Sequence, residues 1–293
     1  MRILVTGGTG FVGRRITGRL QGRHEVVLLR REGATTPLPD GVGVLAGDVT
    51  DPSSLAGKLA GFDAVIHLVA IIEEHGDATF DGVIRRGTEN IVAAARAGNV
   101  PRFIHMSALG ARDDPAYPYH QAKWRAEEAV RQSGLEWTIF RPSVIFGKGD
   151  GFITVLAGVV RAFPLTPIAG SGEARFQPVQ VDDVADCFVR AVDDPEMTQG
   201  QVYELGGAKP YTYDQMIDVI AQRLGVNRPR VHVPLPLMKA VVAASAPLPK
   251  ALRPPVTSEQ LKMLSLDNST DHSATGELIG REPFALEDGI DYL

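Results

Sequence analysis

The sequence contains a single cysteine, Cys187, among its 293 residues, so the chain cannot form an internal disulfide. This composition is typical of a reducing compartment, and the apolar residues around Cys187 predict a buried thiol. Long apolar runs are also absent: none reaches the roughly 20 uncharged residues that span a bilayer. The apolar start is cut short by glycines, which predicts a strand and no signal peptide. We therefore expect a cytoplasmic protein.

Concentrated positive charge is missing as well. The chain has 30 Lys and Arg residues against 35 Asp and Glu residues, a net charge of −5, with no dense basic stripe. This balance argues against nucleic acid as the main partner. The histidines show no spacing typical of metal ligands, so no metal site is predicted. The glycine-lysine loop of NTPases and the Gly-x-Ser-x-Gly of α/β-hydrolases are both absent.

The most apolar segment covers residues 233–249, where prolines and Lys239 interrupt the run. It predicts a short apolar helix that covers a cleft. The alternative is that this segment docks on a membrane surface or a protein partner. In that alternative, the protein lies peripherally at the inner face of a membrane.

The most informative motif that is present stands at the amino terminus. Residues 3–5 form an apolar strand pattern, and the glycines of a Gly-x-x-Gly-x-x-Gly pattern follow directly, before an amphipathic helix. Glycines there allow a tight turn and let a pyrophosphate approach the backbone N–H groups at the helix start. The motif predicts a dinucleotide site whose expected cofactor contacts are Gly7, Gly10, Phe11, Val12 and Gly13.

Strand and helix patterns alternate through the first half of the chain, which predicts βαβ units and a parallel sheet. The expected strands cover residues 3–5, 25–29, 42–45, 64–69, 103–106 and 136–141. We predict an α/β fold, a Rossmann-type doubly wound parallel sheet with a smaller α/β lobe. Its nucleotide-binding domain covers residues 1–149, with 179–206 returning to it, and the lobe covers 150–178 and 207–293.

The end of the second strand selects the cofactor. It carries Arg30 and Arg31 and no acidic residue, and an arginine there favours the 2′-phosphate of NADP over the hydroxyl of NAD. We therefore predict NADP(H), with NAD(H) as the less favoured alternative. Asp48 and Val49, after the third strand, are placed to contact the adenine.

A candidate catalytic pair follows the fifth strand. Tyr119 and Lys123 stand four residues apart in a predicted helix at 119–133, which puts both on one face. A tyrosine hydroxyl is a poor acid or base at neutral pH unless a nearby positive charge stabilises its phenolate form. The spacing therefore predicts an acid–base pair.

Together these motifs resemble the extended short-chain dehydrogenases/reductases. The match is closest to their atypical branch, which contains the NADPH-carrying accessory subunit of respiratory complex I (the alpha-subcomplex-9 type) and bacterial relatives. The supporting segments are 6–13, 47–49, 67–70, 102–111, 119–123, 136–147 and 176–183.

The resemblance implies several further roles. It places His67, Leu68, Val69 and Ala70 along the adenosine ribose and phosphates, and it makes Tyr119 and Lys123 the acid–base pair. It also implies contacts to the nicotinamide from Pro142, Ser143 and Val144.

The chain departs from the family pattern at two positions. Ala108 occupies the usual place of a catalytic Ser or Thr, and Ile84 the place of a common Asn. Ser107 is a candidate substitute, although neighbouring strand residues point to opposite faces. Arg175 and Gln177, in the lobe, are candidate substrate contacts.

These observations favour an NADP(H)-dependent oxidoreductase that moves hydride between the nicotinamide and a carbonyl or alcohol carbon of an unidentified small-molecule substrate. A non-catalytic NADP(H)-binding accessory or redox-sensing protein, docked on a respiratory or membrane enzyme, is one alternative. A nucleotide-sugar epimerase or dehydratase is another.

Overall fold

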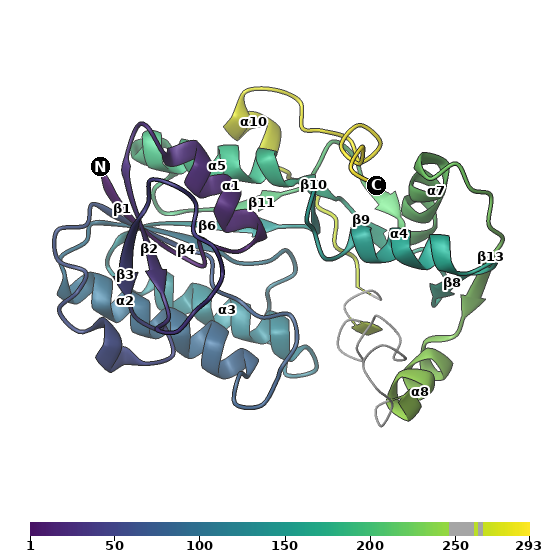
Figure 1. The fold of residues 1–293 in the computed structure, drawn as a ribbon, viewed down its shortest axis with the longest axis horizontal. Coiled ribbons are helices and arrows are strands. Elements are labelled where there is room, and N and C mark those ends of the chain that lie inside the picture. The colour runs from purple at the N-terminus through teal and green to yellow at the C-terminus, as the bar shows by residue number, and fades with distance from the viewer. Residues whose placement is uncertain (246–260, 263–265) are drawn as a thin grey trace. The chain divides into compact units, whose positions relative to one another are not determined.

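The structure is a computed structural model that describes residues 1–245, 261–262 and 266–293 (Figure 1). The chain folds into two units. The first comprises Met1–Pro142, Val181–Leu205 and Ala274–Arg281, and the second comprises Ser143–Gln180, Gly206–Ser273 and Glu282–Leu293. The first unit thus ends seven residues before the predicted position 149, and it gains a segment near the carboxyl terminus that the sequence did not indicate.

The first unit is built on a seven-stranded parallel sheet with the order β11-β6-β5-β4-β1-β2-β3. The central strands β1, β4 and β5 are almost entirely buried, as expected for short apolar strands with helices on both faces. The strands are β1 (Arg2–Thr6), β2 (Glu25–Arg30), β3 (Gly43–Ala46), β4 (Ala64–His67), β5 (Arg102–Met106), β6 (Glu136–Pro142) and β11 (Gln201–Leu205). The predicted Rossmann-type sheet is confirmed.

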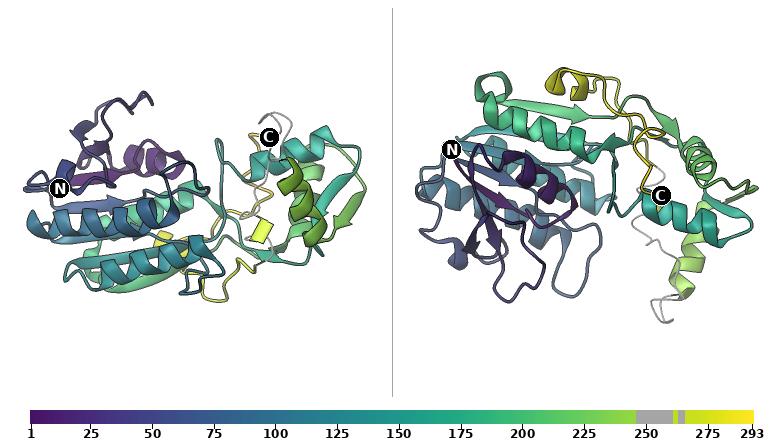
Figure 2. Two further views of the ribbon diagram at one scale, coloured as in Figure 1. Left: turned by 90° about the horizontal axis from the view of Figure 1, so that it is seen from below. Right: turned by 45° about the horizontal axis from the view of Figure 1, so that its top comes forward.

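Helices cover both faces of this sheet (Figures 1 and 2). On one face, α1 (Phe11–Leu20) packs against α5 (Val181–Asp193), and α10 (Thr275–Ile279) also contacts α5. On the other face, α2 (Gly87–Ala97) packs against α3 (Pro118–Arg131). A π-helical turn, η2 (Asp81–Arg86), leads into α2.

Residues 179–206 were predicted to return to the first unit, but the first two of them belong to the second unit. Val179–Gln180 forms β10, which pairs with β7 (Ile145–Phe146) of the second unit, and the following residues form α5. Only β11, at the end of the segment, joins the main sheet. Cys187 lies on the buried face of α5 as predicted, and burial raises the pKa of its thiol. Two short elements complete the unit, η1 (Pro52–Leu55) and α6 (Pro195–Thr198).

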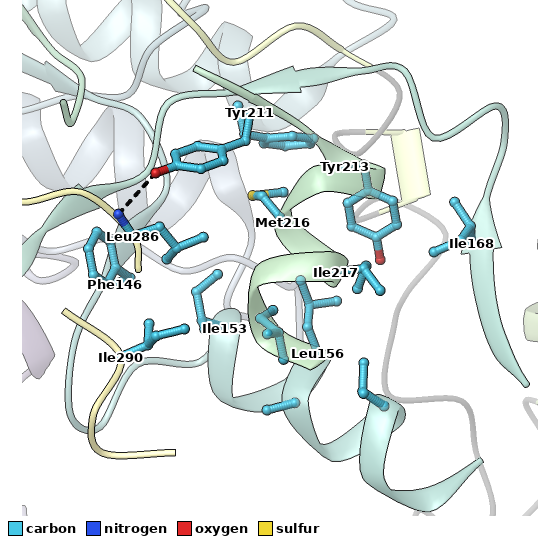
Figure 3. Close-up of a cluster of buried hydrophobic side chains, with 14 of the residues drawn as sticks. Phe146, Ile153, Leu156, Ile168, Tyr211, Tyr213, Met216, Ile217, Leu286 and Ile290 are labelled. Carbon is cyan, nitrogen blue, oxygen red and sulfur yellow. Dashed lines mark hydrogen bonds between the residues drawn. The ribbon is translucent and has the colours of Figure 1, made fainter. Parts of the chain in front are cut away.

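The second unit has its own apolar core, which Figure 3 shows in close-up. Two helices, α4 (Ile153–Ala162) and α7 (Tyr213–Arg223), pack against each other in this core. Two further two-stranded sheets flank it: β9 (Arg175–Phe176) with β12 (Tyr211–Thr212), and β8 (Thr166–Ala169) with β13 (Arg230–Val233). Helix α8 (Leu235–Ser245) follows β13.

Segment 233–249 is described only in part. Its described residues end β13 and form α8, whereas residues 246–249 lie outside the described ranges. Among the residues that the structure describes, no helix has the length and apolar character needed to cross a membrane.

The carboxyl-terminal residues are part of the second core. Leu286 and Ile290 are fully buried there, and the backbone N–H of Leu286 donates to the Tyr211 hydroxyl at 3.2 Å (Figure 3). Asp150, 5% exposed, accepts hydrogen bonds from the backbone at the start of α4 and from the Tyr292 hydroxyl. A buried carboxylate therefore ties the end of the chain to α4.

We expect Tyr292→Phe to lower the free energy of unfolding by about 1.5–3 kcal/mol, because it removes one donor from a buried charged group. Urea denaturation of the full chain measures this loss. Tyr117→Phe is the matched control, since the Tyr117 hydroxyl has no hydrogen-bond partner among the described residues. Equal stability of the two variants would contradict the assigned role of Tyr292.

Candidate functional site

The glycine motif forms a tight turn between β1 and α1. Gly7 has a φ of +73°, a conformation that favours glycine, and its carbonyl accepts the Gly10 N–H at 3.0 Å. A Cβ on Gly13 would clash with the Gly7 carbonyl oxygen, so only glycine lets α1 approach the turn this closely. The predicted local geometry of Gly7, Gly10 and Gly13 is therefore present.

The start of α1 fits a diphosphate. The helix begins after Gly10 with no side-chain cap and no acidic residue in its first turn, so its first N–H groups and its dipole are available to an anion. Phe11 is half-buried and Val12 buried. The Leu68 N–H donates to the Thr6 carbonyl at 3.1 Å, which brings the chain after β4 beside the turn. Val69 and Ala70, which follow, are half-buried.

The two arginines after β2 have different surroundings. The guanidinium of Arg30 donates to the carbonyls of Ala34 and Thr36 and so holds the following loop. Arg31 is exposed and lines a cavity of about 540 Å³ together with Asp48 and Lys58. Arg31 also lines a second cavity of about 750 Å³. Of the two arginines, Arg31 is thus the one whose charge faces open space.

The predicted adenine contacts lie at the carboxyl end of β3. Asp48 lines the first cavity and accepts hydrogen bonds from the N–H and hydroxyl of Thr50 at 2.9 and 2.8 Å. Val49 is buried, and its carbonyl accepts the Asn90 side-chain amide at 2.8 Å. In doubly wound sheets this carboxyl edge is where nucleotides bind.

The residues predicted near the nicotinamide fall in both units. Pro142 ends β6 in the first unit, where its carbonyl accepts the Leu109 N–H at 2.9 Å. Ser143 and Val144 belong to the second unit. Asn268 Oδ1 accepts from the Ser143 hydroxyl at 2.7 Å and from the Val144 N–H at 3.0 Å.

The two candidate substrate contacts differ in exposure. Gln177 is buried, and its amide donates to the Gly207 carbonyl and accepts the Thr270 N–H. Its polar atoms are therefore used to hold the second unit together. Arg175 is exposed and keeps its guanidinium at the surface.

Tyr119 and Lys123 project from the first two turns of α3, which starts at Pro118. The Lys123 ammonium, 1% exposed, donates to the Met106 carbonyl at 2.8 Å, and this anchors it at the carboxyl end of β5. Among the described residues, the Tyr119 hydroxyl has no hydrogen-bond partner. The Tyr119 ring packs edge-on against Phe80, with ring centroids 5.7 Å apart.

Burial shifts the pKa values of both Tyr119 and Lys123. Burial raises the pKa of the Tyr119 phenol to about 12. Burial also lowers the pKa of the Lys123 ammonium to about 8, and attraction by Glu127 opposes this shift. At neutral pH the phenol keeps its proton and the lysine keeps its charge, so the chain alone presents a protonated acid.

Ser107 is committed to a buried ion network. Its hydroxyl donates to Glu127, whose fully buried carboxylate also binds Arg131 and Arg141. The Arg141 guanidinium donates two hydrogen bonds, from Nε and Nη2, at 2.8 and 2.7 Å. Such a paired, multiply bonded carboxylate is a rigid anchor.

The two positions that depart from the family pattern are apolar in the structure as well. Ile84 is fully buried in η2 and packs in one cluster with Phe80 and Tyr119. Ala108, half-buried, follows Ser107 and supplies no hydrogen-bonding side chain. The phenol of Tyr119 thus faces an apolar wall on the η2 side.

Two buried histidines lie within reach of the Lys123 charge, and the sequence did not indicate that they form a pair. His67, which the resemblance places along the adenosine ribose, is fully buried and bonded within the first unit. His67 on β4 and His105 on β5 are cross-strand neighbours with stacked rings, 5.5 Å apart at their centroids. Thr88 donates its hydroxyl proton to the Ile84 carbonyl, so it must accept from His67 Nε2–H. His67 Nδ1 then accepts from the Thr6 hydroxyl at 2.6 Å.

Both histidines are held neutral. Burial, with a smaller contribution from the Lys123 charge, lowers the pKa of His67 to about 3. Burial also lowers the pKa of His105 well below its usual value, and neither ring nitrogen of His105 has a partner among the described residues. The signal available in the sequence was the matching position of each histidine near the end of its strand.

The fold and this site define an NAD(P)-binding protein with a Rossmann-type core. The NAD(P)H-binding family matches residues 7–195, so the chain belongs to that family. Its relatives include complex I subunits and bacterial reductases of the extended short-chain dehydrogenase/reductase type, as the motifs indicate.

Three relatives illustrate the range. The chain is 29% identical, over 82% of its length, to the mitochondrial NADH dehydrogenase [ubiquinone] 1 alpha subcomplex subunit 9 of Arabidopsis thaliana, and the match spans 62% of that longer protein. It is 28% identical to a 3 beta-hydroxysteroid dehydrogenase/Delta 5→4-isomerase of Mycobacterium tuberculosis, over 96% of this chain and 86% of the other. It is 29% identical to a ceramide reductase of Caulobacter vibrioides, over 80% and 74%.

A solved structure supports the fold. A nucleoside-diphosphate-sugar epimerase from Staphylococcus aureus superposes with a TM-score of 0.79, covering 99% of this chain and all of the other at 20% identity. At that identity the likeness concerns the fold alone.

The buried histidines predict a dependence of stability on pH. The unfolded state takes up protons below about pH 6.5, whereas the folded histidines resist protonation, so stability is complete above that pH and falls on acidification. Each histidine contributes a slope of up to about 1.4 kcal/mol per pH unit. For His67 this continues towards a pH of about 3.

Between about pH 6.5 and 4.5 the free energy of unfolding of the wild type should fall as the pH falls. We expect this slope to be smaller in His105→Leu, by up to about 1.4 kcal/mol per pH unit. Urea denaturation at several pH values measures the slope. His272→Gln, at an exposed position, is the control and should keep the wild-type slope. A wild-type slope in His105→Leu would rule out the buried pair as the source.

Proposed function

We propose that this chain is an NADP(H)-dependent oxidoreductase of the extended short-chain type that reduces a carbonyl group on a hydrophobic substrate. The observation that carries the proposal is the pair on α3: Lys123 is fixed to the Met106 carbonyl, and Tyr119 carries a hydroxyl without a partner among the described residues. Together with the glycine turn, this pair supplies an acid and a cofactor cradle in one unit.

The glycine turn and the start of α1 would hold the cofactor diphosphate. Bound NADPH supplies the hydride for the carbonyl carbon, as its nicotinamide does generally. Tyr119 would donate its phenolic proton to the carbonyl oxygen as the alcohol forms. The buried Lys123 ammonium would stabilise the phenolate that remains.

The protonated state of the phenol supports the role of Tyr119 as a proton donor. A pKa of about 12 keeps Tyr119 protonated at neutral pH, which suits an acid in carbonyl reduction better than a base in alcohol oxidation. The hydrophobic substrate class is supported by the names of two relatives, which act on a hydroxysteroid and a ceramide. The apolar cluster around Tyr119 is consistent with that class.

A second candidate is a non-catalytic NADP(H)-binding accessory protein. Apolar residues at positions 84 and 108, where the family pattern has polar ones, favour it, since they remove groups that polarise a carbonyl. Its relative in Arabidopsis, a complex I subunit, is also consistent with this role.

We expect Tyr119→Phe to reduce kcat/KM about 10²–10⁴-fold, because the proton donor is lost. The assay follows NADPH oxidation with 3-ketosteroids and long-chain ketones. NADPH binding should stay unchanged in this variant, and Tyr117→Phe should keep wild-type turnover. Turnover at the wild-type rate in Tyr119→Phe would contradict the assignment of Tyr119 as the proton donor. Tight NADPH binding by wild type with no turnover on any carbonyl would support the accessory role instead.

Arg31 should set the preference for NADP(H). We expect Arg31→Ala to weaken NADPH binding by about tenfold or more while leaving NADH binding nearly unchanged, because only NADPH carries the phosphate. Arg30→Ala is the contrasting variant: it releases the loop that Arg30 holds, so both cofactors should be affected alike. Titration by fluorescence gives the dissociation constants of NADPH and NADH for the wild type and for both variants. An equal effect of Arg31→Ala on both cofactors would contradict the assignment.

A further inference from the structure

Helix α8 of the second unit has an apolar surface. Met238 and Val242 pack against the core, and this fixes the orientation of the helix. On the outward side, Leu237 is 56% exposed and Val241 is 52% exposed, one turn further along. The exposed residues of the helix are Pro236, Leu237, Ala240, Val241, Ala243 and Ala244. A water-exposed helix usually turns polar residues outward. The apolar outward surface of α8 therefore indicates contact with an apolar partner or layer.

Exposed apolar side chains are concentrated in the same unit. Of the nine large apolar side chains that are exposed in the described ranges, six belong to the second unit. Besides Leu237 and Val241 they are Phe163, Leu165, Val231 and Phe284. Val231 lies on β13, directly before α8, and β13 pairs with β8.

The charge around α8 has one sign along the sequence. From residue 219 to residue 258 the chain has no Asp or Glu, although its net charge is −5. Within that stretch, Arg223 pairs with Asp291, and Arg230 pairs with Asp218 and Asp214. Lys239, on α8 itself, and Arg228 have no ion-pair partner among the described residues.

An apolar helix surface that carries a lysine without an ion-pair partner among the described residues matches an anionic lipid surface. Side chains such as leucine and valine partition into the boundary between head groups and acyl chains, and lysine extends its ammonium to the phosphates. We propose that α8 docks the second unit on an anionic membrane surface, with Leu237 and Val241 inserted and Lys239 at the head groups.

A second copy of the chain is a poorer occupant. A two-fold contact through α8 would place the same surface on both sides and bring the unpaired Lys239 of each copy towards like charge. An anionic bilayer supplies the opposite charge together with the apolar layer. The proposal does not depend on the reaction, since a non-catalytic chain would dock in the same way.

The test is co-sedimentation of the full chain with vesicles. One set contains phosphatidylcholine alone, and the other includes about 30 mol% phosphatidylglycerol, whose negative charge should attract Lys239. We expect binding to the anionic vesicles that is at least about tenfold stronger than to the neutral ones, and weaker at high salt.

Variants locate the contact. Leu237→Asp and Val241→Asp should each weaken binding to the anionic vesicles by about tenfold or more, because each replaces an inserted apolar group by a charge. Lys239→Gln should weaken binding about fivefold, the cost of losing about 1 kcal/mol of attraction to the lipid surface. Ile72→Asp is the matched control: Ile72 is 57% exposed but lies in the first unit, so binding should not change.

Three results would overturn the proposal. One is binding to neither set of vesicles, and another is binding that Leu237→Asp and Ile72→Asp affect equally. The third is a concentration-dependent dimer in light scattering that Leu237→Asp abolishes, because this would assign the surface to a second copy. Circular dichroism of each variant checks that its fold is intact.

Discussion

The position of α3 on the central sheet depends on one buried carboxylate. Glu127 is fully buried and receives hydrogen bonds from Ser107 on the β5 side and from Arg141 on β6, while Arg131 pairs with it from its own helix. Losing one partner of such a buried pair typically costs about 3–5 kcal/mol, because an uncompensated charge remains. Tyr119 and Lys123 stand eight and four residues earlier on the same helix face, so this anchor also fixes their height above the sheet.

The surroundings of α3 are polar near Glu127 and apolar near Tyr119. On the side of Glu127, charges are paired and the lysine is held by a backbone carbonyl. On the side of Tyr119, the neighbours are Phe80, Ile84 and other apolar groups. A phenol there has no competing hydrogen bond within the described chain.

The sequence predicted the features that local patterns control. The glycine turn, the strands of the parallel sheet and the helix predicted at 119–133 follow from short-range geometry and hydrophobic period. All are present, the helix as α3 (Pro118–Arg131). The assignment of 1–149 to one domain was less exact, because the break after Pro142 and the return of 274–281 depend on contacts far apart along the chain.

Local sequence patterns also could not predict which side chains contact each other. Two neighbouring arginines look alike in the sequence, yet Arg30 is used to hold its own loop and Arg31 faces a cavity. Ser107 was a candidate catalytic hydroxyl in the sequence, whereas in the structure it donates to Glu127, 20 residues away. The stacked histidines depend on the register of β4 against β5, which no single strand encodes.

The distribution of the chain between the two units has a consequence for synthesis. The polypeptide passes from one unit to the other five times, so neither unit corresponds to a continuous gene fragment. On the ribosome, the first 142 residues would emerge with β6 as an open edge, since its neighbour β11 is translated some sixty residues later. An uncovered edge of that kind is where a nascent chain is vulnerable to wrong pairing, and the interval until β11 appears is when a chaperone would matter most.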